Sequence, residues 1–458
     1  MDFKSALLVL LVYFIRPQDW IAALNGVGIV TPIMLVAFAT MIQRSRSLGI
    51  KLDFLRTPHD WGMLAYYAYV VYTSSDPSAT FKDAFSLFAF YFVTVQALSS
   101  VTRLHIYLKT WMWAVFTLAA FGVLSIIGWD ITGARAMTES MQGRLALGTW
   151  MHNNPNALGH TLITAIPLAY FLYFWKKSIG RKILAAGIVM VCFSAVYQTE
   201  SKGAVVAGFV SIVLSYSFGK SKFVQILLLS AALAGGGAAI SLMPRMETMG
   251  SMRSDEGIQG RLLAWDQAKI AVQNHFTGEG WKTFHAIIKW QKIWMPKATH
   301  SSYVKLGADL GYPGMFLYVG ILWLGVRTLL RAKPMDDELR RCQQCLFTLI
   351  ISYIISNWMI DRAYHTEFFL FMAAIGAYHR LALLNKELNE NLEEPQEIPA
   401  WQLPPMTSWL ADQRTQSTSA QNMIFKYSLT KPSVVDAVIA LCGTYLIFYI
   451  WDYILINL

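Results

Sequence analysis

The feature that most constrains this chain is a series of apolar runs long enough, or nearly so, to cross a lipid bilayer. A bilayer core is about 30 Å thick, and a helix needs about 20 mostly apolar residues to span it. Only 14% of the 458 residues are charged and 55% are hydrophobic, whereas about 25% of a soluble domain is charged. The runs lie near residues 5–15, 21–42, 61–73, 84–98, 106–128, 157–175, 183–199, 203–218, 223–243, 303–330, 345–360, 365–384 and 433–455. The sequence therefore predicts an all-α polytopic membrane protein with about 12–13 transmembrane helices.

Basic residues in the short connections predict how the chain is oriented. The 38 Lys and Arg outnumber the 28 Asp and Glu, which gives a formal net charge of +10. Alternate connections hold basic clusters, and cytoplasmic loops of membrane proteins carry such an excess. The N-terminus is therefore predicted to be cytoplasmic, and the long loops 129–156 and 244–302 to face outward. The net charge thus reports topology and not a nucleic-acid partner. The intervening short connections hold a single cation each: Arg16, Lys82, Lys202 and Arg362.

The segment 385–431 differs from the rest because it is rich in Asn, Glu, Gln, Ser and Pro. Such a composition buries little apolar surface, so we predict a flexible cytoplasmic linker. The final run 433–455 either spans the membrane or packs at its surface. The predicted organisation is N-terminal membrane helices 1–198, a core 199–384 that includes the partly helical outer loop 244–302, the linker, and a C-terminal membrane helix 432–458.

The outer loop 244–302 is too long for a mere connection. Apolar residues within 258–276 recur at helical spacing, which predicts an amphipathic helix at the outer membrane boundary. Arg261 and Trp265 are four residues apart and share a face. Either they form a cation–π contact, or Arg261 reaches out to lipid headgroups. Gly278-Glu279-Gly280 predicts a tight turn rather than a phosphate loop, because no predicted strand precedes it.

His300 stands immediately before the tenth apolar run. The N-terminus of a helix favours an anion through its free N–H groups and its dipole. A neutral imidazole there could accept a proton from a hydroxyl; alternatively, His300 or a neighbouring serine simply caps the helix. Lys202, in the outward turn 199–204, either holds a lipid phosphate or anchors the chain at the interface. His152 and His160 lack a third ligand, so no metal site is predicted.

Four motifs within residues 199–325 together resemble the O-antigen ligase/polymerase superfamily. They are Ser201-Lys202-Gly203, Gly260-Arg261 with Trp265, Gly278-x-Gly280 with Phe284, and His300 ahead of Gly307, Gly311 and Gly314. The N-terminal stretch 13–20, YFIRPQDW, resembles the O-glycosylation ligase branch associated with exosortase systems.

The resemblance implies a transferase of the bacterial inner membrane that uses no metal and no cofactor. Such enzymes move a glycan from undecaprenyl diphosphate to an acceptor hydroxyl of lipid A core, a protein or another polysaccharide on the periplasmic face. His300 matches the family's essential histidine and Arg261 its phosphate-binding arginine. Lys202 stands where many relatives have Arg, and Ser301 where Asn is usual. The cations predicted to hold the donor diphosphate are Arg261, Lys202, Arg16 and Arg144.

Two other functions are compatible with a membrane protein of this kind. A polymerase would use the same residues, with another lipid-linked glycan as its acceptor. A transporter of the lipid-linked glycan is disfavoured, because transporters show inverted repeats and ionisable residues near the midplane. Here the candidate polar residues gather at the outer ends of the predicted spans.

Overall fold

The computed structural model describes residues 2–48, 55–218, 220–241, 256–290, 293–334, 336–393 and 432–457. Each of the thirteen apolar runs contains a helix, and the two short strands pair with each other, so the predicted all-α fold is confirmed. The helices are α1 (Asp2–Ile15), α2 (Pro17–Trp20), α3 (Val30–Leu48), α4 (Pro58–Tyr72), α5 (Pro77–Ala97), α6 (Val101–Ile126), α7 (Ala134–Ser140), α8 (Pro155–Leu162), α9 (Ala165–Ala169), α10 (Ile179–Gln198), α11 (Lys202–Ser217), α12 (Lys222–Ser241), α14 (Glu256–Asn274), α15 (Ser302–Arg331), α16 (Asp337–Ser356), α17 (Thr366–Glu393) and α19 (Val434–Asn457). The 3₁₀ helix η1 (Ala22–Leu24), the π-helix η2 (Tyr170–Phe174), β1 (Ala286–Trp290) and β2 (Ile293–Lys297) complete the fold.

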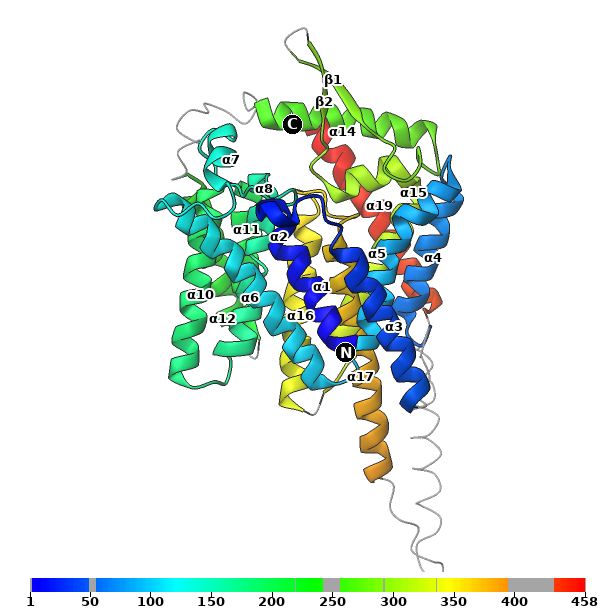
Figure 1. Ribbon diagram of the computed structural model, residues 1–458. Coiled ribbons are helices and arrows are strands. Elements are labelled where there is room, and N and C mark those ends of the chain that lie inside the picture. The colour runs from blue at the N-terminus through cyan, green and yellow to red at the C-terminus, as the bar shows by residue number, and fades with distance from the viewer. Residues whose placement is uncertain are drawn as a thin grey trace, which may run out of the picture.

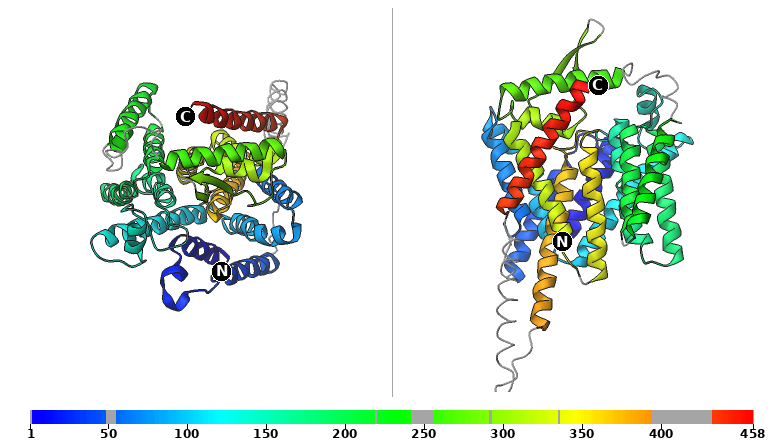
Figure 2. Two further views of the ribbon diagram at one scale, coloured as in Figure 1. Left: turned by 90° about the horizontal axis from the view of Figure 1, so that it is seen from above. Right: turned by 180° about the vertical axis from the view of Figure 1, so that it is seen from behind.

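Most helices stand side by side as a bundle, and α14 lies across one end of it (Figure 1). Helices α10, α11 and α12 occupy one side and α3, α4 and α5 the other, as the view from above shows (Figure 2). The β1–β2 hairpin projects beyond α14, whereas α17 projects from the opposite end (Figure 1). Helix α2, helix α7 of the loop 129–156, and α14 with the hairpin from the loop 244–302 therefore share one end of the bundle, the α14 end (Figure 1). Which side of the membrane this end faces stays a prediction.

Five helical segments of the described residues are long and apolar enough to cross a membrane. They are Val101–Ile126, Pro155–Phe174, Ile179–Gln198, Ser302–Arg331 and Val434–Asn457. The last of these is α19, so length and composition favour a span over surface packing for the C-terminal run. Polar residues set where helices begin: Thr57 and Asp60 form a reciprocal capping box before Pro58.

Two boundaries differ from the prediction. The run 21–42 becomes a regular α-helix only at Val30, because α2 and η1 turn the chain first and Gly26 adopts a left-handed φ of 76°. Helix α17 continues to Glu393, so residues 385–393 are helical and not part of a flexible linker. This stretch is rich in Asn, Glu, Leu and Lys, and most of these extend a helix at little cost. Residues 394–431 lie outside the described residues.

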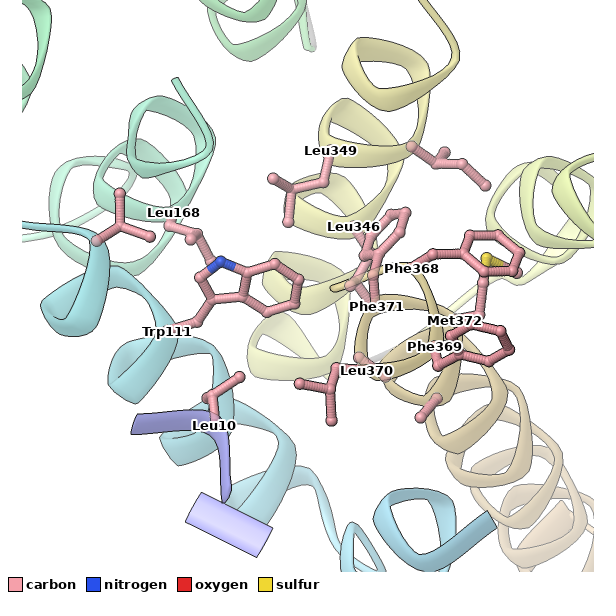
Figure 3. Close-up of a cluster of buried hydrophobic side chains, with 14 of the residues drawn as sticks. Leu10, Trp111, Leu168, Leu346, Leu349, Phe368, Phe369, Leu370, Phe371 and Met372 are labelled. Carbon is pink, nitrogen blue, oxygen red and sulfur yellow. The ribbon is translucent and has the colours of Figure 1, made fainter. Parts of the chain in front are cut away.

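One hydrophobic core joins helices from both halves of the chain (Figure 3). Trp111 of α6 belongs to it: its ring centre lies 5.4 Å from that of Phe14 and 6.2 Å from that of Phe371. Leu10 and Leu168 belong to the same cluster. This shared core therefore fixes the helices relative to one another, and with them the segments at the α14 end. The predicted division at residue 198 stays a prediction.

Helix α15 is broken at Gly311, where φ is 63° and ψ is −162°. The turn after α14 fills the break. The N–H of Glu279 donates to the Ala308 carbonyl at 3.0 Å, and that of Gly280 donates to the Asp309 carbonyl at 2.7 Å. A Cβ on Gly311 would stand 2.0 Å from a backbone oxygen, so only glycine fits. The predicted tight turn at 278–280 is thus confirmed, and it satisfies carbonyl groups that the broken helix leaves open.

Candidate active site

A cavity of about 270 Å³ at the α14 end brings together three of the predicted phosphate-binding cations. Arg144 comes from the loop before α8, Lys202 from the start of α11, and Arg261 from α14. The cavity wall thus carries three cations and one carboxylate. The lining residues are Arg144, Asn156, His160, Glu200, Ser201, Lys202, Gly203, Val206, Ile258, Arg261 and Met359.

The sharp turn before α11 places Lys202 in the cavity wall. Glu200 adopts a left-handed φ of 50°, and the Ser201 hydroxyl caps the helix by accepting from the Ala204 N–H at 3.4 Å. Lys202 is therefore the first residue of a 16-residue helix, and the positive end of that helix's dipole faces the cavity. A Cβ on Gly203 would stand 2.6 Å from Met359 Sδ and 2.9 Å from Met359 Cβ, so a larger residue there would force Met359 to shift.

Arg144 is fixed by two hydrogen bonds to neutral acceptors. Its Nε donates to the Thr199 carbonyl at 3.0 Å, and its Nη2 donates to Asn156 Oδ1 at 2.9 Å. The guanidinium is thereby held between the turn before α11 and the first turn of α8. Asn154 caps α8 by accepting from the Asn156 N–H at 2.9 Å. Asn154 and Pro155 thus start the helix of the sixth apolar run.

On α14, Trp265 anchors the helix and Arg261 lines the cavity. Trp265 Nε1 donates to the Thr299 carbonyl at 2.7 Å, which anchors α14 to the segment that leads into α15. Arg261 lines the cavity. A Cβ on the preceding Gly260 would stand 2.7 Å from Lys297 Cε, so the Lys297 side chain crosses α14 beside Arg261. Lys297 is thus a further cation at this end.

His300 is not the helix cap. Ser301 caps α15 by accepting from the Val304 N–H at 3.4 Å, and His300 precedes it with a left-handed φ of 50°. Burial, first, and then the nearby charges of Arg261, Lys297 and Arg144 together lower the pKa of His300 to about 4. The imidazole is therefore neutral at neutral pH. A left-handed backbone at a non-glycine residue costs energy and is often found at functional sites.

Arg16 lies apart from the residues that line the cavity. Its Nε pairs with Asp19 Oδ2 at 2.5 Å, and its guanidinium lies 5.3 Å from the centre of the Trp150 ring. Arg16 therefore contacts Asp19 and Trp150 at the same end of the bundle, outside the cavity wall. Of the five predicted site residues, the structure gathers four: three in the cavity wall and His300 within electrostatic range of two of them.

The structure adds residues that the sequence did not single out for this site. Asn156 and His160 both line the cavity, and their four-residue spacing on α8 was an available signal. Lys297 was missed because it ends β2, a strand that the sequence did not predict.

A family model described as O-antigen ligase matches residues 186–319. The match covers less than a third of the chain and includes Lys202, Arg261 and His300. It supports the resemblance to the O-antigen ligase superfamily and a ligase- or polymerase-like glycan transfer. A search of curated proteins found no match.

Proposed function

We propose that this protein is an O-antigen ligase-type glycosyltransferase of the bacterial inner membrane. It moves an oligo- or polysaccharide from undecaprenyl diphosphate to an acceptor hydroxyl of lipid A core, a protein or another surface acceptor, on the periplasmic face. The observation that carries the proposal is the convergence of Arg144, Lys202 and Arg261 on one cavity, with His300 within electrostatic range of Arg261 and Arg144.

On the donor side, the cavity suits a diphosphate leaving group. Negative charge develops on the leaving oxygen as the sugar–phosphate bond breaks, and fixed cations stabilise it. Arg261 offers a planar fork and Lys202 a compact charge, each from a rigid helix. The start of α11 adds the positive end of its dipole. The chain's own residues thus supply the charge stabilisation that the reaction requires.

On the acceptor side, His300 is the general base. The acceptor oxygen bonds to the anomeric carbon, its proton passes to the imidazole, and undecaprenyl diphosphate departs with the bonding electrons. With a pKa of about 4, His300 is a weak base before the donor binds. The anionic diphosphate offsets Arg261, Lys297 and Arg144, so donor binding raises the pKa of His300 and strengthens it as a base.

Reconstitution tests this proposal. The purified protein is placed in liposomes with a labelled lipid-linked glycan and an acceptor, without an energy source. We expect the label to move to the acceptor while undecaprenyl diphosphate is released. Longer lipid-linked chains in place of a labelled acceptor would identify a polymerase. Movement of the label across the bilayer without any transfer would contradict the proposal and identify a transporter.

A further inference from the structure

Arg16 and Asp19, at the start of α2, hold the exposed side chain of Trp150 in a fixed position. Arg16 and Asp19 form a two-pronged ion pair, with Nε–Oδ2 at 2.5 Å and Nη2–Oδ1 at 3.1 Å. Asp19 Oδ2 also accepts from the backbone N–H of Trp150 at 2.8 Å, and the guanidinium lies 5.3 Å from the ring centre. The His365 ring lies nearly parallel to the indole, with the ring centres 6.4 Å apart. Despite these contacts, 68% of Trp150 is exposed.

In the part of the chain that the structure describes, two buried polar atoms of residues that neighbour Asp19 and Trp150 in the sequence have no hydrogen-bond partner. Among the described residues, neither Gln18 Oε1 nor His152 Nε2 has a hydrogen-bond partner, although both atoms are buried. The other ring nitrogen of His152 lies 3.2 Å from Thr149 Oγ1. A buried polar atom without a partner costs about 1–3 kcal/mol. Arg16 also has a left-handed φ of 49°, a strain that the surrounding contacts must hold in place.

The indole lies close to the cation cavity. Trp150 and the cavity residue Asn156 are separated by six positions in one loop, so their Cα atoms are at most about 20 Å apart. Helix α2 and the start of α8 lie at the same end of the bundle (Figure 1). A short run of sugar units attached to a diphosphate in the cavity can cover such a distance.

We infer that Trp150, Arg16 and Asp19 form a sugar-binding subsite. The apolar face of a pyranose ring would stack on the rigid, exposed indole. Its hydroxyls, which both donate and accept, would pair with Arg16 and Asp19, whose side chains remain 20% and 14% exposed. This inference rests on the proposed function, and it adds a binding position for the glycan. The sugar belongs either to the donor glycan or to the acceptor.

The test compares Trp150→Ala with Trp129→Ala. Trp129 is a matched control because it is 71% exposed and lies in the connection between α6 and α7. In reconstituted transfer assays we expect Trp150→Ala to raise the KM of one substrate about tenfold, as loss of a tryptophan anchor typically does, with the Trp129 variant unchanged. A higher KM for the lipid-linked glycan assigns the subsite to the donor, and a higher KM for the acceptor assigns it to the acceptor.

Two further measurements separate this inference from a structural role and from the proposed function. Undecaprenyl diphosphate without sugar should bind the Trp150→Ala variant as it binds the unaltered protein, and Trp150→Phe should retain most of the sugar affinity. Glycan released from the carrier by mild acid should bind the solubilised protein and not Trp150→Ala, whether or not transfer occurs. Equal effects of the two alanine variants, or no effect of Trp150→Ala on glycan binding, would overturn the subsite.

Discussion

The fully buried arginines and the cations that line the cavity are used in different ways. Arg362 is only 3% exposed. It pairs with Glu367 and donates to the Ala157 carbonyl at 2.5 Å and to Thr161 Oγ1 at 2.7 Å. Arg327 likewise pairs with Asp436. These charges hold helices together, because a buried cation without a partner is very unfavourable.

The cavity cations Arg144, Lys202 and Arg261 instead converge on an open volume. Arg144 is held by a backbone carbonyl and a side-chain amide, and it lines the same cavity as Lys202 and Arg261. The comparison teaches that burial, and not residue type, separates the arginines that join helices from the cations proposed to bind the donor. Loss of a bundle arginine should therefore cost stability, whereas loss of a cavity cation should cost activity.

The largest expected effect is on catalysis. Arg261→Ala and His300→Ala should each abolish transfer, a loss of at least about a hundredfold, because they remove charge stabilisation and the general base. Transfer assays on protein of equal amount and melting temperature give the measurement. Lys269→Ala is the control on the same helix, since Lys269 pairs with Asp452 at 2.7 Å outside the cavity. Near-normal transfer by both Arg261→Ala and His300→Ala would contradict the catalytic role proposed for these two residues.

Arg362→Ala should affect stability most. It leaves Glu367 buried without its partner, and breaking a buried pair costs about 3–5 kcal/mol. We expect a clear drop in melting temperature in detergent, with the cavity variants unchanged. The double variant Arg362→Ala/Glu367→Ala should recover part of the loss, because no uncompensated charge remains. A normal melting temperature for Arg362→Ala would contradict the structural role.

Much of the fold follows from local patterns, but contacts between distant segments do not. The apolar runs and the caps at Thr57, Asn154 and Ser301 are local signals. The β1–β2 hairpin carries Pro296, which argues against a strand in a sequence, yet a two-stranded pair has edges that tolerate it. The break at Gly311 depends on a turn some thirty residues earlier, which no local pattern reveals.

The candidate site shows the same limit. Arg16 and Arg144 look alike in the sequence, since both are cations in outward connections. The structure separates them by their partners: Arg16 pairs with Asp19, three residues later, whereas Arg144 reaches Thr199 and Asn156. Asp19, three residues after Arg16, is visible in the sequence as a partner. The contact with Trp150 is not, because it depends on how the loop that carries Trp150 folds.

Lys202 should have a smaller effect than Arg261. Lys202→Ala removes one charge-assisted contact to the diphosphate, so we expect the donor KM to rise about tenfold with kcat less affected. Lys202→Arg keeps the charge and should be tolerated. Binding of undecaprenyl diphosphate to the two variants gives a direct measurement. Equal donor affinity in Lys202→Ala and the unaltered protein would show that Lys202 only anchors the chain.

The pH dependence is the smallest effect and the sharpest test of how the cavity cations act on His300. A base must be neutral, so activity is lost as the pH falls through its pKa. The pKa of His300 in the free enzyme is about 4. Protonation of His300 should therefore leave kcat/KM unchanged at neutral pH and lower it only near pH 4. Bound diphosphate offsets the neighbouring cations and raises that pKa, so the acid limb of kcat should lie at higher pH than that of kcat/KM. Coincident limbs would mean that the donor's charge does not lie beside His300, and the cavity would then not be the diphosphate site.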